Sequence, residues 1–144
     1  MELICSELAS ECIFCEIINL ADKSIIVTQT KEATALISLE GHALVIPNMH
    51  ISSANVENCV NDMVGTFKLA YSLMSVVKEA YGVDSVSLIQ NIGKSAGQEV
   101  DHLHLHLIPR SQGDKLVAIR VQEVDRSVRL ANAAKLREIL KKRY

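Results

Sequence analysis

The 144-residue sequence has no tryptophan, two phenylalanines and three tyrosines, so aromatic residues make up only 3% of the chain. It has no apolar run near the roughly 20 residues that a membrane-spanning helix needs. Its start, MELICSELASE, is acidic and lacks a basic segment followed by an apolar one, so no secretory signal is visible. We therefore expect a cytoplasmic protein that has no membrane partner.

An excess of charge of one sign is also missing. Lys and Arg number 15 against 17 for Asp and Glu, which gives a formal net charge of −2. Such a balance gives no overall attraction to nucleic acid, so we expect no nucleic-acid partner. Any phosphate that the protein binds must be held by a local site. The 49% hydrophobic and 22% charged content is that of a globular protein, and the length suits one domain.

Cysteine is scarce, with four in the chain. In a reducing compartment, cysteines favour metal binding or free thiols over disulfides. Cys12 and Cys15 form a C-x2-C pair, which is the usual half of a tetrahedral zinc site, although two nearby cysteines also pack together without a metal. We expect Cys59 to pack in the interior and Cys5 to be a free thiol.

The apolar pattern predicts an α+β fold with about five strands in a mostly antiparallel sheet. A spacing of three and four from 57 to 81 predicts a long central helix, with Gly82 as its C-cap. The stretch 127–144 predicts a final helix whose basic end, KLREILKKRY, we expect to be a solvated face. Five β-rich runs predict the strands, and they span residues 24–29, 32–39, 43–47, 85–91 and 102–109.

Three of the five histidines alternate with leucines in DHLHLHLIPR, residues 101–110. On a strand, alternate residues point to the same face, so the three histidines would share one face and the leucines would face the core. A polar outer face is one interpretation, but other polar residues would serve it equally well. One metal cannot hold all three, because the outer pair lie roughly 13 Å apart and zinc ligands lie about 2.1 Å from the ion.

The row of histidines can still supply one metal ligand. His50 follows the apolar run ALVIP, and together with Cys12, Cys15 and one histidine of the row it would complete a closed Cys2His2 zinc site. At least one histidine of the row must then have another role.

The segment NIGKSAGQEVD, residues 91–101, precedes the row. Its two glycines and small residues suit an ordinary turn, but they also let backbone N–H groups approach a phosphate. Asn91 and Gln98 add neutral donors. A phosphate cradle beside histidines indicates phosphoryl or nucleotidyl transfer, in which a neutral imidazole attacks phosphorus.

These segments together resemble the histidine triad (HIT) family of nucleotide hydrolases and transferases, in its zinc-containing, microbial-type branch. The family signature alternates three histidines with hydrophobic residues, and HLHLHLI at 102–108 fits it throughout. CIFCEII at 12–18 resembles the N-terminal motif of the zinc-containing branch. GHALVIPNMH at 41–50 and NIGKSAGQEVDHLHLHLIPR at 91–110 resemble two further family blocks.

The resemblance implies a role for each matching residue. His104, the middle histidine of the row, would be the nucleophile that takes a nucleoside monophosphate, with His106 and His42 beside it. The positions that match phosphate-binding residues of the family are Asn91, Gly97, Gln98 and Glu99. The positions that match the ligands of a structural zinc ion are Cys12, Cys15, His50 and His102.

The sequence departs from the family pattern in three places. Glu99 stands where eukaryotic members carry Ser or Thr, and an ionised carboxylate repels phosphate. The short link ISLEGH lacks the aspartate that grips the ribose in relatives; Ser38 is the nearest equivalent and Glu40 a possible substitute. PNMH at 47–50 replaces a basic segment.

The resemblance implies a HIT domain at 12–112, preceded by an N-terminal extension at 1–11 and followed by a C-terminal segment at 113–144 in the same globular unit. It implies a homodimer that cleaves a nucleoside monophosphate, AMP by preference, from a phosphoramidate or dinucleotide-like substrate through a nucleotidyl-histidine. Two alternatives stay open. One is a non-catalytic nucleotide-binding or signalling protein, and the other is a zinc-stabilised interaction module.

Overall fold

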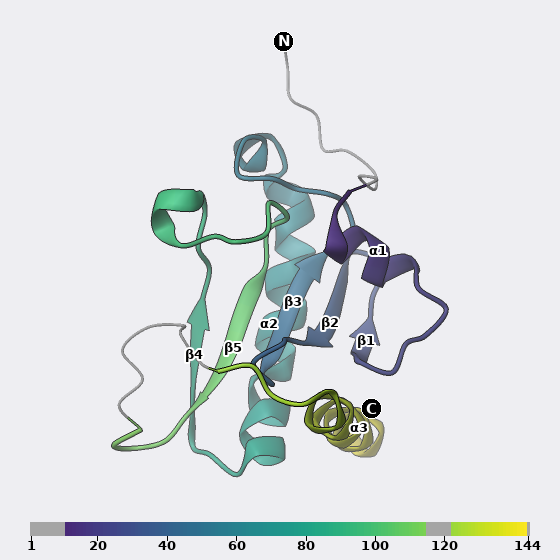
Figure 1. Ribbon diagram of the computed structural model, residues 1–144, viewed down its shortest axis with the longest axis vertical. Coiled ribbons are helices and arrows are strands. Elements are labelled where there is room, and N and C mark those ends of the chain that lie inside the picture. Colours follow the sequence, from purple (N-terminus) through teal and green to yellow (C-terminus); the bar gives the residue numbers. More distant parts are fainter. Residues whose placement is uncertain (1–10, 115–121, 144) are drawn as a thin grey trace.

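The β-rich runs form one five-stranded sheet in the computed structural model, with the order β1-β2-β3-β5-β4 (Figure 1). Every neighbouring pair is antiparallel, which confirms the predicted α+β fold. The structure describes residues 11–114 and 122–143. The strands are β1 (Ile26–Gln29), β2 (Ala33–Ile37), β3 (Ala43–Pro47), β4 (Ser85–Ile89) and β5 (Leu105–Arg110).

Helices cover both faces of this sheet. The long α2 ends at Gly82, whose φ of 64° is the left-handed conformation that glycine adopts readily, so the predicted C-cap is confirmed. The helices are α1 (Ile13–Asn19), α2 (Val60–Tyr81) and α3 (Arg126–Arg143), with short 3-10 turns η1 (Val56–Asn58) and η2 (Lys94–Ala96). None of the described helices is both long enough and apolar enough to cross a membrane.

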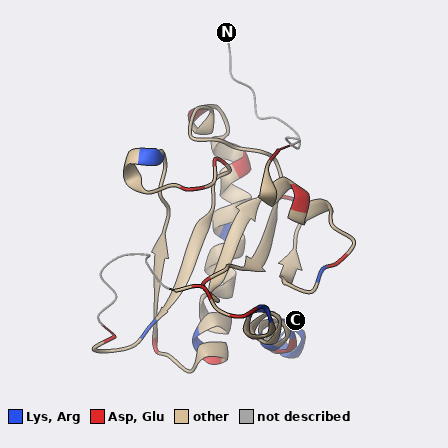
Figure 2. Cartoon of the chain, viewed as in Figure 1, with Lys and Arg blue, Asp and Glu red and all other residues tan. Residues whose placement is uncertain are grey.

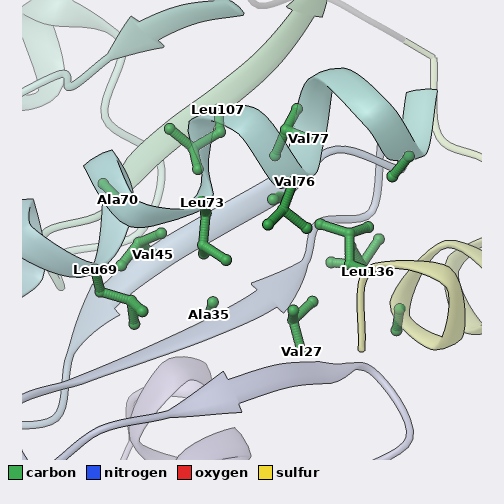
Figure 3. Close-up of a cluster of buried hydrophobic side chains, with 14 of the residues drawn as sticks. Val27, Ala35, Val45, Leu69, Ala70, Leu73, Val76, Val77, Leu107 and Leu136 are labelled. Carbon is green, nitrogen blue, oxygen red and sulfur yellow. The ribbon is translucent and has the colours of Figure 1, made fainter. Parts of the chain in front are cut away.

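The main core lies between one face of the sheet and helices α2 and α3 (Figure 3). Val45 and Leu107 from the sheet, Leu73 and Val76 from α2, and Leu136 from α3 meet there. Burying each such side chain contributes about 1.5–3 kcal/mol. A second apolar cluster, which includes Phe14 and Leu44, lies between α1 and the opposite face of the sheet. The central strands are therefore buried on both faces, and they present a rigid support for residues at their ends.

The last strand begins later than predicted, at Leu105 rather than His102. The alternation of leucine and histidine continues across this boundary, so the pattern alone gives no sign of it. Residues 102 to 104 are all buried, and the Leu103 N–H donates to the Ile51 carbonyl at 2.7 Å. The prediction that the strand begins at His102 is therefore wrong, since His102 and His104 precede it. The rings of His104 and His106 still lie side by side, with a centroid distance of 4.9 Å.

The basic C-terminal end has the predicted solvated face, because Lys135, Lys141 and Arg143 are exposed, but the opposite side of this helix is buried. Leu136 is fully buried and Ile139 nearly so, because one side of α3 packs into the main core. Arg137 donates to the carbonyls of Ser24 and Ile26 at 3.1 and 2.8 Å. Charged residues occur along α3, whereas the strands carry few of them (Figure 2). The helix is thus an integral part of the fold.

The cysteines divide into two kinds. Cys12 and Cys15 are free and buried. Cys59 is buried beside Ile51, as predicted, but it is disulfide-bonded, so the expectation of metal binding or free thiols does not hold for it. The prediction of a free thiol at Cys5 lies outside the described residues.

Candidate metal centre and histidine site

Four metal-ligand side chains meet at the end of the sheet where β3 finishes and β5 begins. Cys12 caps α1 and Cys15 lies in its first turn, His50 follows β3 and His102 precedes β5. Their ligand atoms all lie within 4.8 Å of one another, and only His50 is not fully buried. The structure therefore places these four residues where they can bind a metal, as the sequence predicted.

The ring of His102 is oriented for this role by a backbone carbonyl. Its Nε2 lies 2.8 Å from the carbonyl oxygen of Pro47. Because a carbonyl oxygen only accepts, Nε2 carries the proton, and Nδ1 keeps its lone pair. That Nδ1 lies 3.3 Å from the sulfur of Cys12 and 3.5 Å from that of Cys15. His50 presents its own Nδ1 at 3.3 Å from the sulfur of Cys15. Two thiols and two imidazoles make the donor set that tetrahedral zinc prefers.

His104 is not a member of this cluster but is attached to it through the backbone. Its Nδ1–H donates to the carbonyl of His102 at 2.8 Å. The other ring nitrogen, Nε2, therefore holds a free lone pair. The ring is 7% exposed, and the edge of Phe14 contacts it with a centroid distance of 5.2 Å. The Phe14 ring also packs at 5.7 Å against the ring of His102.

A second pair of histidines lies beside His104. The ring of His106 stands 4.9 Å from that of His104, measured between centroids. Its Nδ1 lies 2.9 Å from Nε2 of His42, so one of these two nitrogens donates to the other. His42 precedes β3, which pairs with β5, and this pairing brings residues 64 positions apart into contact. The structure thus brings His42, His104 and His106 together, as the resemblance implied.

Burial makes these histidines neutral at physiological pH. It lowers the pKa of His106 to about 3 and that of His102 to about 4. Burial also lowers the pKa of His104 and His42, while the negative charge of Glu40 acts in the opposite direction on both. Neutral imidazole is the form that acts as a nucleophile or a metal ligand.

The loop between β4 and β5 brings the predicted phosphate-binding residues close to one another. Gly97 has a φ of 95°, a conformation that favours glycine, and it lies beside the side-chain amide of Asn91, whose Nδ2 would be 3.4 Å from an added Cβ. The side chain of Gln98 is buried, and it holds the loop itself. Its oxygen accepts from the Gly93 N–H at 2.7 Å and its amide donates to the Val100 carbonyl at 2.8 Å. Sequence reasoning treated this amide as a donor for an anion and missed its internal bonds.

Glu99 is exposed on the same loop, and its charge acts to raise the pKa of His104 against the larger effect of burial. Its carboxylate therefore lies within electrostatic range of that ring. Sequence analysis singled out this position as a departure from the family, and the structure places it near the site.

A tightly held turn at residues 38–41 leads into His42, and no local sequence pattern predicted the contacts that hold it. The guanidinium of Arg129 in α3 donates to the carbonyls of Ser38 and Ile37 at 2.9 and 3.0 Å. The Gly41 carbonyl accepts from the hydroxyl of Tyr81 at 2.5 Å and from the side-chain amide of Asn132 at 2.9 Å. Helices α2 and α3 thus fix the turn that presents His42.

The chain belongs to the HIT domain family, whose pattern it matches over residues 20–113. This confirms the resemblance drawn from the sequence. Adenosine 5′-monophosphoramidase of Saccharomyces cerevisiae is 34% identical over 124 residues, which cover 82% of this chain and 75% of the yeast protein.

Solved structures agree with this assignment. A histidine triad nucleotide-binding protein from Sulfolobus tokodaii is similar with a TM-score of 0.77 and 28% identity, and the match covers 91% of this chain and 93% of that one. A zinc-bound histidine triad family protein from Mycobacterium smegmatis has a TM-score of 0.73 and 26% identity, with coverage of 92% and 94%. The predicted HIT-like fold is thereby confirmed.

Proposed function

We propose that the protein is a nucleotide hydrolase or transferase that cleaves a nucleoside monophosphate, AMP by preference, from a phosphoramidate or a dinucleotide-like substrate. The observation that carries this proposal is the state of His104. Its Nδ1–H is committed to the His102 carbonyl and its ring is buried, so Nε2 is a neutral, oriented nucleophile. The similarity to an adenosine 5′-monophosphoramidase supports the choice of substrate.

In the first step, the Nε2 lone pair of His104 forms a bond to the α-phosphorus, and the bond from phosphorus to the leaving group breaks. The leaving group keeps that electron pair and takes up a proton from water. The imidazole ring gains positive charge as the bond forms, and the His102 carbonyl that accepts from Nδ1 stabilises this charge. In the second step, water attacks phosphorus, the bond to Nε2 breaks and the nucleoside monophosphate leaves.

The neighbouring histidines would bind the phosphate without adding positive charge. Nδ1 of His106 is engaged with His42, so Nε2 is the nitrogen that remains for a phosphate oxygen. When His42 donates in this pair, Nε2 of His106 carries a proton and can donate it in a hydrogen bond. Asn91 and the backbone at Gly97 would hold the other phosphate oxygens, and Gln98 would shape this loop. Glu99 would lie at the edge of this phosphate-binding site, nearest the leaving group.

We propose that the metal held by Cys12, Cys15, His50 and His102 is zinc and that its role is structural. The donor set suits zinc, and all four positions are filled by protein side chains, which is typical of a closed site. The similarity to a zinc-bound family member supports this choice. These residues join α1 to the ends of β3 and β5, and so fix the backbone at 102 to which His104 is attached.

We propose that the protein forms a homodimer in which the outer side of α2 contacts the second copy. This side bears an apolar groove of about 540 Å³. Its lining includes Val64 and Tyr71, which are 46% and 64% exposed, a large apolar area for a single chain to leave in water. Val64→Lys should therefore dissociate the dimer in sedimentation experiments, whereas Asn61→Lys, on the same helix outside the groove, should not. A monomeric wild-type protein would contradict the proposal.

We also propose that the chain comprises an N-terminal extension at 1–11, a HIT domain at 12–112 and a C-terminal segment at 113–144 that belongs to the same globular unit. The location that we propose is the cytoplasm.

Turnover of adenosine 5′-phosphoramidate tests the function. Wild-type protein should release AMP, and His104→Ala should lose at least about a thousandfold in kcat, as expected when a covalent nucleophile is removed. Lys135→Ala, at an exposed position of α3, serves as the control. Thermal-shift measurements with AMP separate the alternatives. A shift without turnover would indicate a non-catalytic nucleotide-binding protein, and neither shift nor turnover would indicate an interaction module.

A further inference from the structure

The C-terminal helix approaches the histidine site from the end of the sheet opposite to the metal cluster. Figure 1 shows α3 beside the end where β2 finishes and β3 begins, whereas the metal cluster lies where β3 finishes. The turn between these strands, residues 38–41, leads directly into His42. Helix α3 lies beyond residues 20–113, over which the chain matches the HIT family, so family membership assigns this helix no role in the site.

Arg129 holds the turn with a planar, two-pronged guanidinium. Its Nε donates to the carbonyl of Ser38 at 2.9 Å, and its Nη2 donates to the carbonyl of Ile37 at 3.0 Å. A guanidinium presents its donors in a fixed fork that suits two neighbouring acceptors, which a lysine ammonium does not. The carbonyls of two successive residues are thereby fixed relative to α3.

Ser38 in turn is bonded to both backbone groups of His42. The Ser38 N–H donates to the His42 carbonyl at 2.8 Å, and the Ser38 hydroxyl oxygen accepts from the His42 N–H at 3.3 Å. Ser38 is only 3% exposed, so these bonds are shielded from water. The backbone of His42 therefore follows that of Ser38, which Arg129 holds.

The ring of His42 acts on the proton of His106. Its Nε2 lies 2.9 Å from Nδ1 of His106. When His42 donates, His106 carries its proton on Nε2, the nitrogen that would donate to a phosphate oxygen. A displaced His42 would leave Nδ1 without this donor. His106 could then carry its proton on Nδ1 instead, and its Nε2 would present a lone pair that repels the phosphate.

We propose that Arg129 is a positioning residue for the reaction. Through Ser38 it fixes His42, and through His42 it keeps the proton of His106 on Nε2. The proposal rests on the function proposed above and adds a residue that acts through others rather than on the substrate. The site is then held from two ends of the sheet, because the metal cluster orients His104 through the backbone and α3 orients the other two histidines.

Arg137 provides a matched control on the same helix. It is partly buried, as Arg129 is, and its guanidinium also donates to two backbone carbonyls, those of Ser24 and Ile26. These carbonyls lie in β1 and just before it, and β2 separates β1 from the strand that follows His42. Loss of either arginine should therefore weaken the packing of α3, but only loss of Arg129 should disturb the histidines.

Turnover of adenosine 5′-phosphoramidate by Arg129→Ala and Arg137→Ala tests the proposal. Both variants should show a similar decrease in Tm, since each loses the hydrogen bonds of one guanidinium. Arg129→Ala should lower kcat by about tenfold or more, because a misplacement of about 1 Å can cost about a hundredfold in rate. Arg137→Ala should keep the wild-type kcat.

Nitrogen NMR of protein with isotope-labelled histidine, without substrate, gives a measurement that does not depend on turnover. The signals of His106 are assigned by their absence from His106→Gln. In wild type and Arg137→Ala, His106 should show a protonated Nε2 and an unprotonated Nδ1. Arg129→Ala should show a mixture of the two protonation forms, which a role in stability alone would not produce.

Equal kcat values for the two alanine variants, or an unchanged His106 spectrum in Arg129→Ala, would overturn the positioning role. If Arg129→Ala does not fold, Ser38→Ala decides, because it removes only the hydroxyl that accepts from His42. Its kcat should fall, and a wild-type kcat would overturn the proposal. These results leave the proposed function standing, whereas the absence of turnover by wild-type protein would overturn both.

Discussion

The Nδ1–H of His104 donates to the backbone carbonyl of His102 at 2.8 Å, and this bond joins the two halves of the site. The side chain of His102 belongs to the metal cluster, while its carbonyl orients the ring that we propose as nucleophile. The same side chain is itself fixed by the Pro47 carbonyl at the end of β3. The position of His104 therefore depends on the order of the metal cluster.

Metal removal should consequently affect both stability and activity. Protein prepared with zinc should lose on the order of 10 °C in Tm when a strong chelator is added, because a ligand bound well above its Kd contributes several kcal/mol. Turnover should fall in parallel. Cys12→Ser should bind less zinc and melt lower, and its Tm should hardly respond to chelator. An unchanged wild-type Tm after complete zinc removal would contradict a structural role.

Acid should destabilise the protein through the buried histidines. The pKa of His106 is about 3 in the folded protein, against about 6.5 in an unfolded chain. Between these values the unfolded chain binds more protons, so the free energy of unfolding falls as the pH is lowered through this window. One such group contributes a slope of up to about 1.4 kcal/mol per pH unit.

Urea denaturation of wild type and His106→Gln at several pH values between 6 and 4 checks this sign. The variant lacks the titrating group and should show a shallower fall in stability on acidification. Parallel curves for the two proteins would show that His106 is not neutral when folded.

Helix α3 should contribute strongly to stability although most of its residues are charged or exposed. Leu136 is fully buried between α3 and the main core. Leu136→Ala should lower the free energy of unfolding by about 2–5 kcal/mol, since it removes apolar contacts and leaves a cavity. The neighbouring Lys135 is exposed, and Lys135→Ala should change stability by less than about 0.5 kcal/mol. Equal effects of the two variants in urea denaturation would indicate that α3 does not pack as described.

The bond from Tyr81 to the 38–41 turn gives a sharper local test. Burial raises the pKa of the Tyr81 hydroxyl, which donates to the Gly41 carbonyl. Tyr81→Phe should cost about 1 kcal/mol of stability, a typical net value for one hydrogen bond, and should lower kcat by loosening His42. Ser127→Ala, which removes the hydroxyl of an exposed residue of α3, is the control. The bond is unimportant if both substitutions leave stability and kcat unchanged.

Much of this structure follows from local sequence patterns. The spacing from 57 to 81 identified α2, and the β-rich runs identified all five strands. The metal cluster was predictable because three histidines in a straight row cannot share one ion, which left Cys12, Cys15 and His50 to join one of them. The resemblance to the family then identified His102 as the fourth ligand. The hydrogen bond from His102 Nε2 to the Pro47 carbonyl is consistent with that role.

Other features depend on contacts between distant residues and have no local signal. Arg129 bonds to Ser38 across 91 positions in the sequence, so nothing near either residue reveals that α3 holds the turn before His42. The late start of β5 depends on the bond from Leu103 to Ile51. The internal role of the Gln98 amide was hidden because the same residue type serves equally well to hold a loop or to bind an anion.

The central claim is that Nε2 of His104 carries the nucleotide during the reaction. Rapid quenching of wild-type protein with adenosine 5′-phosphoramidate, followed by mass spectrometry of intact protein and of its peptides, measures this directly. The account predicts one added nucleotidyl group per chain, located on His104, absent from His104→Ala and formed as fast as turnover. Turnover without any such adduct, or an adduct on another residue, would contradict it.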